Sequence, residues 1–408
     1  MAGEAWKRMP LGDFVTLQRG HDLPDDRRRP GNVPILGSFG ITGWHDEARA
    51  PGPGVTVGRS GASFGVVSYS PGDYWPLNTA LYVIDFHGND PRFAYYFLKQ
   101  FDFKGYNSGS AQPSLNRNFI HPVPVDVPPI DEQRAIAHIL GMLDDKIELN
   151  RRMNETLEAM ARALFKSWFV DFDPVRAKAE ARDPGLPKPL ADVFPARLVG
   201  SKLGEIPKGW QVIPLPKAIE VNPTRSLRKG EIAPYLDMAN MPTREHTPGA
   251  VFDRPFGSGM RFINGDTLLA RITPCLENGK TAYVDFLGKG QVGWGSTEYI
   301  VLRPKPPLPK EFAYCLARSD GFRQFAIQSM TGSSGRQRVP AESLSHYMLA
   351  EPPAQVAKRF GSFVRPLFAS SSAASRESCT LTALRDTLLP KLMSGEKKLT
   401  SRSTSHED

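Results

Sequence analysis

The chain contains few combinations of residues that could carry out catalysis. Residues 278–281 read Asn-Gly-Lys-Thr, but Pro274 stands where a phosphate-binding loop needs its first glycine, so this segment predicts a turn. Asn222 in NPTR and Phe256 in FGSGM do not match the loops with which a base methyltransferase holds the target amino group and S-adenosylmethionine. Residues 396–398, Glu-Lys-Lys, lie in a charged tail rather than beside a strand, which does not favour a metal-dependent nuclease. The eight histidines form no His-x-x-x-His pair and none is near a cysteine. We therefore expect no catalytic residue, no metal site and no bound cofactor.

Two polar loops do carry the side-chain types that contact nucleic acids. Their glycines allow close approach of the backbone, their serine hydroxyls and amides can bond to phosphates, and Arg, Gln and Asn match the edges of bases. The loops could also be ordinary polar surface, but their recurrence at the same place in both halves favours a function. The candidates are Lys104, Asn107, Ser108, Ser110, Gln112, Asn116 and Arg117 in the first half and Ser333, Ser334, Arg336, Gln337 and Arg338 in the second, followed by Arg59, Ser60, Arg271 and Lys280.

Composition agrees with a protein that binds a polyanion. The chain has 408 residues, of which 40% are hydrophobic, enough for two or three domains, and its net charge is +8. Its three cysteines, Cys275, Cys315 and Cys379, show no Cys-x-x-Cys spacing, which fits a reducing cytoplasm. No apolar run approaches the roughly 18 to 20 residues needed to span a bilayer, and the first ten residues lack the apolar core of a signal peptide. We expect a cytoplasmic protein that does not bind a membrane.

The elements that must position these loops are arranged as a tandem repeat. Matched residues recur in the same order, and their separation grows along the chain, as a duplication followed by loop insertions predicts. The matches are Trp6 and Leu11 with Trp210 and Leu215, Arg59 with Arg271, Trp75 with Trp294, Phe93-Ala94-Tyr95 with Phe312-Ala313-Tyr314, and Pro128-Pro129 with Pro352-Pro353.

Each half begins with a mixed domain, residues 1–129 and residues 207–352. In the first, short β-rich runs at 55–57, 65–69 and 81–86 alternate with turns, and a helix follows Pro91. In the second, runs at 265–272, 280–286 and 298–304 correspond, and one helix is predicted over 311–328. The fold class is therefore α+β: two mixed α/β domains in a tandem pseudo-two-fold repeat.

A long helix follows each double proline, over residues 130–172 with Asp131 as N-cap and over 353–395 with a break at Pro390. Both follow heptads whose seams are apolar at the ends and polar or small in the middle, so we expect them to form an antiparallel coiled coil about 60 Å long that separates the domains. The alternative is that each helix packs on its own domain. The pairing residues are Ile136, Leu140, Leu143, Ile147, Asn150, Asn154, Leu157 and Leu164 in the first helix and Phe360, Val364, Leu367, Leu381 and Leu388 in the second.

The remaining segments are expected to be irregular. Residues 173–206 are rich in Pro, Ala, Lys and Arg and predict a linker with about one helical turn. Residues 396–408, ending in SRSTSHED, predict a disordered tail.

Residues 128–175 resemble the first helical spacer of the specificity subunits of type I restriction-modification enzymes. Their sequence is PPIDEQRAIAHILGMLDDKIELNRRMNETLEAMARALFKSWFVDFDPV. LTALRDTLLPKLMSGE resembles the end of the second spacer, whereas PPAQVAKRF departs from the usual start of that helix. The resemblance implies a noncatalytic subunit whose two target-recognition domains each read half of an asymmetric site in double-stranded DNA.

The same resemblance implies that the helices dock two methyltransferase subunits, which use S-adenosylmethionine, and that two restriction subunits, which use ATP and Mg²⁺, join the complex. Two alternatives remain: a single-chain methyltransferase or nuclease with its own recognition domain, against which the missing motifs argue, and a two-domain scaffold that binds no DNA.

Overall fold

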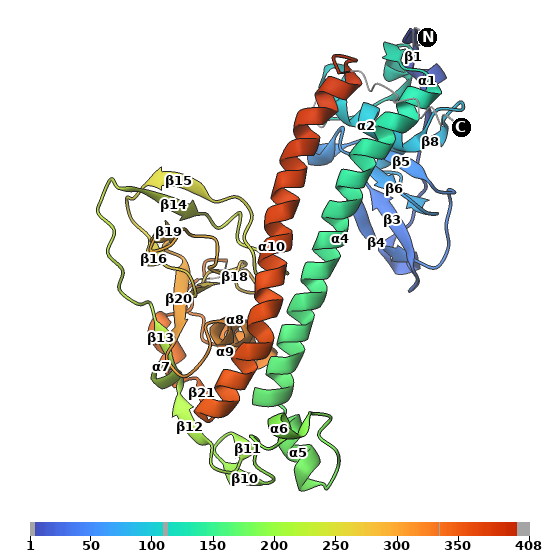
Figure 1. Ribbon diagram of the computed structural model, residues 1–408. Coiled ribbons are helices and arrows are strands. Elements are labelled where there is room, and N and C mark those ends of the chain that lie inside the picture. Colours follow the sequence, from blue (N-terminus) through green and yellow to red (C-terminus); the bar gives the residue numbers. More distant parts are fainter. Residues whose placement is uncertain (1–4, 109–112, 334, 398–408) are drawn as a thin grey trace, which may run out of the picture. The chain divides into compact units, whose positions relative to one another are not determined.

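The computed structural model describes residues 5–108, 113–333 and 335–397 (Figure 1). By its internal contacts the chain divides into two units: unit 1 comprises Met1–Ile147 and Cys379–Asp408, and unit 2 comprises Glu148–Ser378. The two long helices, α4 (Ile130–Phe169) and α10 (Ala354–Met393), therefore each contribute one part to unit 1 and the rest to unit 2. The predicted tail beyond residue 397 lies outside the described residues.

Both units are mixtures of short strands and helices. Apart from the long helices, unit 1 contains β1 (Lys7–Pro10), α1 (Leu11–Phe14), β2 (Thr16–Arg19), η1 (Asp25–Arg27), β3 (Val33–Gly37), β4 (Gly40–His45), β5 (Gly54–Gly58), η2 (Gly61–Ser63), β6 (Val67–Ser70), β7 (Trp75–Pro76), β8 (Ala80–Asp85), α2 (Pro91–Gln100), η3 (Phe103–Tyr106), α3 (Arg117–Ile120) and β9 (Pro124–Val127). Unit 2 contains α5 (Asp173–Ala179), α6 (Lys188–Ala191), β10 (Leu198–Ser201), β11 (Gly204–Pro207), β12 (Gln211–Pro214), α7 (Leu215–Ala218), β13 (Ile219–Val221), β14 (Ile232–Leu236), β15 (Phe252–Pro255), β16 (Met260–Phe262), β17 (Thr267–Ala270), β18 (Thr281–Tyr283), β19 (Gly293–Gly295), β20 (Tyr299–Pro304), α8 (Glu311–Arg318), α9 (Asp320–Gln328), η4 (Ala341–His346) and β21 (Met348–Glu351). Within the described residues, no helix combines the length and the apolar character needed to cross a bilayer.

The sheets of the two units have the same topology, which confirms the predicted tandem repeat. The order β2-β8-β5-β6 in unit 1 corresponds to β13-β20-β17-β18 in unit 2, and β1-β9 corresponds to β12-β21. The second sheet of each unit contains one parallel pair, in which Trp75 lies beside Ile35 and Trp294 lies beside Tyr235. The matched tryptophans thus occupy the same strand of the same sheet. Unit 2 adds β16 at the edge of that sheet and a separate hairpin of β10 and β11.

The helix that follows the first sheet is continuous in unit 1 and interrupted in unit 2. Asp90 caps α2 by accepting from the backbone N–H of Phe93 at 2.8 Å, and Phe93 and Tyr96 are fully buried. The prediction of a single helix over residues 311–328 is wrong, because Ser319 adopts an extended conformation between α8 and α9. Its hydroxyl donates to the carbonyl of Leu316 at 2.7 Å, which satisfies one of the free carbonyls at the end of α8.

The helices α4 and α10 pack against each other in both units, and the direction is antiparallel. In unit 2, Asn150 donates to Ser378 at 3.3 Å, Asn154 donates to Ser375 at 2.9 Å, and Phe165 lies 6.0 Å from Phe360. In unit 1, Ile136 and Leu140 share a core with Leu389 and Leu392. None of the residues expected at the seams is exposed: Ile136, Leu140, Leu143, Ile147, Asn150, Asn154, Leu157, Leu164, Phe360, Val364, Leu367, Leu381 and Leu388 are all buried or half-buried.

Two details of the long helices differ from the sequence-based expectation. Asp131 is not the N-cap but lies in the first turn of α4, where its negative charge interacts favourably with the positive end of the helix dipole. The helix α10 does not break at Pro390 but continues to Met393. A proline inside a helix costs about 3 kcal/mol, and the burial of Leu389 and Leu392 on either side of Pro390 in the core of unit 1 offsets that cost.

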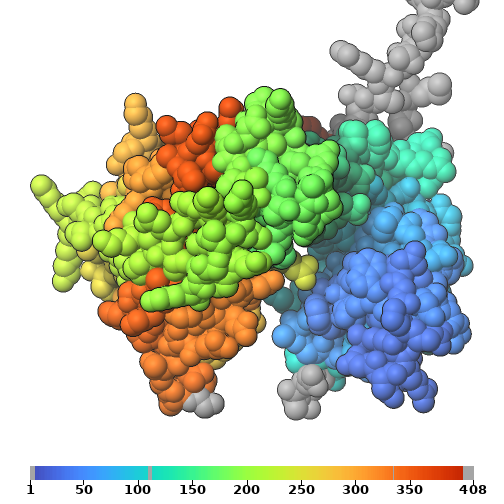
Figure 2. All heavy atoms as spheres, turned by 90° about the horizontal axis from the view of Figure 1, so that it is seen from below, coloured from blue at the N-terminus to red at the C-terminus, as the bar shows by residue number. Residues whose placement is uncertain are grey.

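The segment expected to be a linker, residues 173–206, is part of the core of unit 2 (green in Figure 2). It contains two short helices and most of the hairpin of β10 and β11 rather than about one helical turn. Phe194 packs edge-on against Trp168, with ring centroids 4.9 Å apart, and Phe172 packs against Trp210 at 5.6 Å. These aromatic contacts hold the connector against the end of α4, and this long-range packing is not visible in a Pro-rich composition.

Candidate nucleic-acid interface

A groove of about 800 Å³ lies in unit 1, beside the C-terminal ends of β2 and β5 in the four-stranded sheet. Three segments far apart in sequence supply its polar lining: the end of β2 and the residues after it, the residue after β5, and the loop before α3. The lining side chains include Arg19, His21, Asp22, Arg59, Ser108, Asn116 and Arg117.

Strand direction explains why Arg19 and Arg59 meet. Both β2 and β5 pair antiparallel with β8, so they run in the same direction and their C-terminal ends lie on the same side of the sheet. Arg19 and Val57 both lie opposite Leu81, which places Arg19 level with the end of β5. Gly20 is required at this point, because a Cβ there would lie 2.2 Å from the carbonyl oxygen of Leu77.

The groove is lined by three arginines and one carboxylate, Asp22, so positive charge predominates in it. Among the described residues, no carboxylate lies within ion-pair distance of Arg19, Arg59 or Arg117. Arg59 donates to the carbonyl of Asn78 at 3.1 Å and Arg117 to that of Leu17 at 3.3 Å, so each guanidinium is held in place while other N–H groups remain for a ligand. Such a groove suits phosphates and the acceptor edges of bases.

The other candidates of unit 1 mainly shape the loop. The carbonyl of Arg59 accepts from the N–H of Leu115 at 2.8 Å. Ser114 donates its N–H to Asn107 at 3.0 Å, accepts from the hydroxyl of Ser108 at 2.8 Å, and lies opposite Ser60 in an isolated bridge. Lys104 is exposed in η3 but does not line the groove. Ser110 and Gln112 lie outside the described residues.

The same backbone connections surround Arg271 in unit 2. Its N–H donates to the carbonyl of Glu298 at 2.9 Å, as that of Arg59 does to Thr79 at 3.0 Å. Its carbonyl accepts from the N–H of Val339 at 2.8 Å. The matched arginines therefore occupy equivalent positions, and each fastens its candidate loop to the end of the sheet.

The charge around Arg271 differs from that in unit 1. Glu298 lies 3.9 Å from the guanidinium of Arg271 and accepts from that of Arg338 at 2.9 Å. The hydrogen bonds that Arg338 donates to Glu298 raise the pKa of Arg338 above its ordinary value. In unit 1 the neutral Thr79 stands in place of Glu298, which explains why Arg59 has no carboxylate partner.

The remaining candidates of unit 2 are divided between surface and interior. Arg336 and Ser333 are exposed and close a turn in which the N–H of Arg336 donates to Ser333 at 3.0 Å. Gln337 is half-buried and its carbonyl accepts from the N–H of Thr273. The amine of Lys280 donates to the carbonyl of Met238, so this charge is used inside the domain. Ser334 lies outside the described residues.

Sequence reasoning missed Arg19, His21 and Asp22. The available signal was the polar run that begins at the last residue of a short strand, Arg19-Gly20-His21-Asp22. That signal is weak, because only the strand order shows that this run meets the residue after β5.

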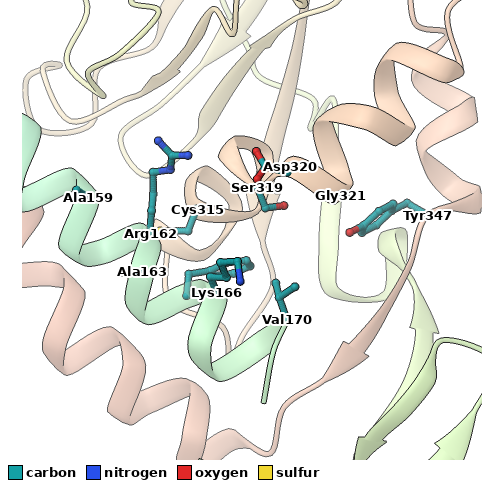
Figure 3. Close-up of a pocket in the computed structure, with 11 residues that line it drawn as sticks. Ala159, Arg162, Ala163, Lys166, Val170, Cys315, Ser319, Asp320, Gly321 and Tyr347 are labelled. Atoms are coloured by element: carbon teal, nitrogen blue, oxygen red, sulfur yellow. The ribbon is translucent and has the colours of Figure 1, made fainter. Parts of the chain in front are cut away.

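A second pocket, of about 400 Å³, lies in unit 2 beside α4 and the junction of α8 with α9 (Figure 3). Arg162 and Lys166 of α4 line it together with Asp320, and Cys315 lies at its wall. Burial raises the pKa of the Cys315 thiol, which disfavours the thiolate that a nucleophile requires. In the part of the chain that the structure describes, no three His, Cys, Asp or Glu side chains are grouped to hold a metal ion.

The fold has two domains of the same topology and two long helices, and comparisons with known proteins show what this chain resembles. Residues 3–159 match the model of the type I restriction modification DNA specificity domain. The chain is 24% identical over 334 residues to the type I restriction enzyme HindI specificity subunit of Haemophilus influenzae, covering 70% of this chain and 71% of that protein. It is 26% identical over 313 residues to the MjaIX specificity subunit of Methanocaldococcus jannaschii, covering 72% of this chain and 66% of that protein, just under two thirds of its length.

The fold is similar to that of the crystal structure of the type I restriction-modification system S subunit from M. genitalium, with a TM-score of 0.61, 16% identity and 97% of each chain covered. Over about 70% of its length the chain is thus similar to type I restriction enzyme specificity subunits, and its first domain and first long helix match the DNA specificity domain model. The resemblance inferred from its spacer helices is thereby confirmed.

Proposed function

We propose that this chain gives a type I restriction-modification complex its DNA sequence specificity, with unit 1 reading one half of a bipartite site and unit 2 reading the other. The observation that carries the proposal concerns two matched arginines: Arg59, which follows β5 in unit 1, and Arg271, which follows β17 in unit 2. Each is bonded through its backbone to a polar loop in the same way. In unit 1 this arginine lines a groove with Arg19 and Arg117.

The differences between the two units support two different half-sites. Unit 1 presents three guanidiniums with no carboxylate partner among the described residues, and these suit phosphates and guanine edges. In unit 2, Glu298 adds acceptors beside Arg271 and Arg338, and a carboxylate accepts from the amino group of cytosine. Two domains of the same fold with different donors and acceptors would read an asymmetric site.

The subunit is noncatalytic in this proposal and acts in the cytoplasm. The helices α4 and α10 dock two methyltransferase subunits, and two restriction subunits join the complex. The methyltransferase subunits use S-adenosylmethionine, and the restriction subunits use ATP and Mg²⁺. The alternative of a single-chain methyltransferase or nuclease would require catalytic motifs that the sequence does not contain, and the buried Cys315 thiol does not supply a nucleophile.

Methylation sequencing of the host, with and without this gene, tests the proposal. Loss of the gene should remove adenine methylation at one bipartite asymmetric motif, and reintroduction should restore it. The motif also identifies the DNA that this chain recognises. Unchanged methylation in the deletion strain would contradict the assignment, provided that the methyltransferase genes are expressed.

Substitution of the groove arginines should weaken binding in a salt-dependent manner. Each phosphate neutralised contributes about 0.9 to the slope of log K against log salt concentration. Arg59→Ala or Arg117→Ala should therefore lower the slope by about one if the side chain binds a phosphate. If it reads a base, the variant should lose about 1 to 3 kcal/mol on the cognate half-site alone. The matched control is Arg182→Ala, because Arg182 is an exposed arginine paired with Glu180 in the connector. Titrations at several salt concentrations that show no change for either groove variant would remove the groove from the interface.

A further inference from the structure

The hairpin of β3 and β4 carries an exposed aromatic side chain at its tip, and this tip lies close to the end of β5, which precedes the groove residue Arg59. Its tip is the two-residue turn Ser38-Phe39, which joins the paired glycines Gly37 and Gly40. Phe39 is 65% exposed, although full burial of a phenylalanine is strongly favourable in water. Ile41 and Trp44 of the same hairpin are also exposed, and Phe39 is the apolar side chain at its tip.

The tip contacts the strand end that carries Arg59. A Cβ at Gly58 would lie 2.3 Å from the carbonyl oxygen of Ser38, so only glycine allows the turn to approach this closely. The next residue, Arg59, lines the groove. Phe39 and the guanidinium of Arg59 therefore lie on segments that touch.

The turn is also short. Gly40 has a φ of +106°, a conformation that side chains rarely adopt, and the hairpin register pairs Gly37 with Gly40 directly. A two-residue hairpin loop of this kind has little freedom, so the entropic cost of positioning Phe39 against a ligand is small.

We propose that Phe39 inserts between base pairs of the half-site read by unit 1, while Arg59 holds the adjacent phosphate or base edge. An apolar side chain that enters a base step unstacks and kinks the duplex, and neighbouring cations then hold the deformed backbone. The inference rests on the proposed function, because it requires that unit 1 binds double-stranded DNA.

Unit 2 does not repeat this arrangement. The corresponding connection between β14 and β15 spans residues 237–251 and runs along β18, where Thr281 donates its N–H to Pro242 at 3.1 Å and Tyr283 donates to His246 at 2.9 Å. The described part of unit 2 thus has no two-residue tip at Arg271. The distortion should occur in one half-site only.

Fluorescence of 2-aminopurine tests the proposal with the full-length chain and no partner subunits. The base is placed in turn at each position of a duplex carrying the motif found by methylation sequencing. Fluorescence should rise several-fold at one step of the unit 1 half-site and remain low throughout the other half. Phe39→Ala should abolish the rise and weaken binding about fivefold or more, the effect of losing one stacked base. Phe39→Trp should retain both.

Two further measurements separate insertion from other roles of Phe39. Phe39→Ala removes no charge and should leave the salt slope unchanged, whereas Arg59→Ala should lower the slope if Arg59 binds a phosphate. The matched control is Trp44→Ala, because Trp44 is 53% exposed on the same hairpin but about 13 Å along the strand from Gly40. That variant should behave like the unaltered chain.

Specific binding with no rise at any position, or a rise that persists in Phe39→Ala, would overturn the insertion and leave the proposed function standing. Failure of the unaltered chain to bind the motif would overturn both.

Discussion

A chain truncated after Val175 is expected to form a homodimer that directs methylation to an inverted repeat of the first half-site. Truncation removes α10, which covers the seam of α4. Leu140 then loses the core that it shares with Leu389 and Leu392, and Phe165 loses Phe360. Exposure of this apolar seam is unfavourable, and a second copy of the same helix can cover it.

The contacts of Asn150 indicate that a second copy fits. Counted from the double prolines, Ala374 and Ser378 stand in α10 where Asn150 and Asn154 stand in α4. Asn150 donates to both of these α10 residues at 3.3 Å. Antiparallel pairing of two α4 helices would therefore place Asn150 opposite Asn150 and Asn154 of the second copy, where amide hydrogen bonds fix the register. A homodimer with two identical domains must read identical half-sites.

Sedimentation measures the dimer, and methylation sequencing of a host that carries only the fragment identifies its motif. Leu140→Glu should abolish the dimer, because Leu140 is fully buried, whereas Met142→Glu should not, because Met142 is 52% exposed on the other face of the same helix. A fragment that stays monomeric at micromolar concentration, or that supports methylation of the original asymmetric motif, would refute this pairing.

The second large effect is expected at a buried ion pair in unit 2. Arg318 donates to Glu158 at 3.1 Å, and the two side chains are only 6% and 4% exposed. The same guanidinium donates to the carbonyls of Thr243 at 2.7 Å and Gly279 at 2.8 Å. Arg318 thus joins α4 to two loops of the domain. Arg318→Met should keep much of the packing but leave a buried carboxylate unpaired, which costs about 3 to 5 kcal/mol.

Urea unfolding of the full chain measures the loss as a lower midpoint for the transition of unit 2. The double variant Glu158→Leu/Arg318→Met should recover much of it, because no buried charge then remains without a partner. Arg182→Met provides the matched control. It breaks an ion pair with Glu180 in which the side chains are 62% and 57% exposed, and such pairs contribute about 1 kcal/mol or less. A loss in Arg318→Met no larger than that of the control would show that the pair does not hold the domain together.

The sequence by itself determined the repeat and the spacer helices. The order of Trp75, Arg59 and the double proline is a property of the chain read from end to end, and their partners occupy the same strands and turns in unit 2. The heptad pattern likewise depends on residues within a few turns of one another, so the long helices could be predicted from local periodicity. The spacer segments also carried the resemblance that the comparisons confirm.

Only the tertiary structure decided which polar residues form a site. Arg19 meets Arg59 because two strands pair with a third, and Glu298 lies 3.9 Å from Arg271 because it directly precedes the neighbouring strand β20. The same holds where local expectation failed: α10 continues through Pro390 because the leucines around it are buried within the core of unit 1. Local propensities are worth about 1 kcal/mol per residue and can be read from a short window. Contacts between segments far apart in the sequence outweigh them, and these depend on strand order and packing that no short window contains.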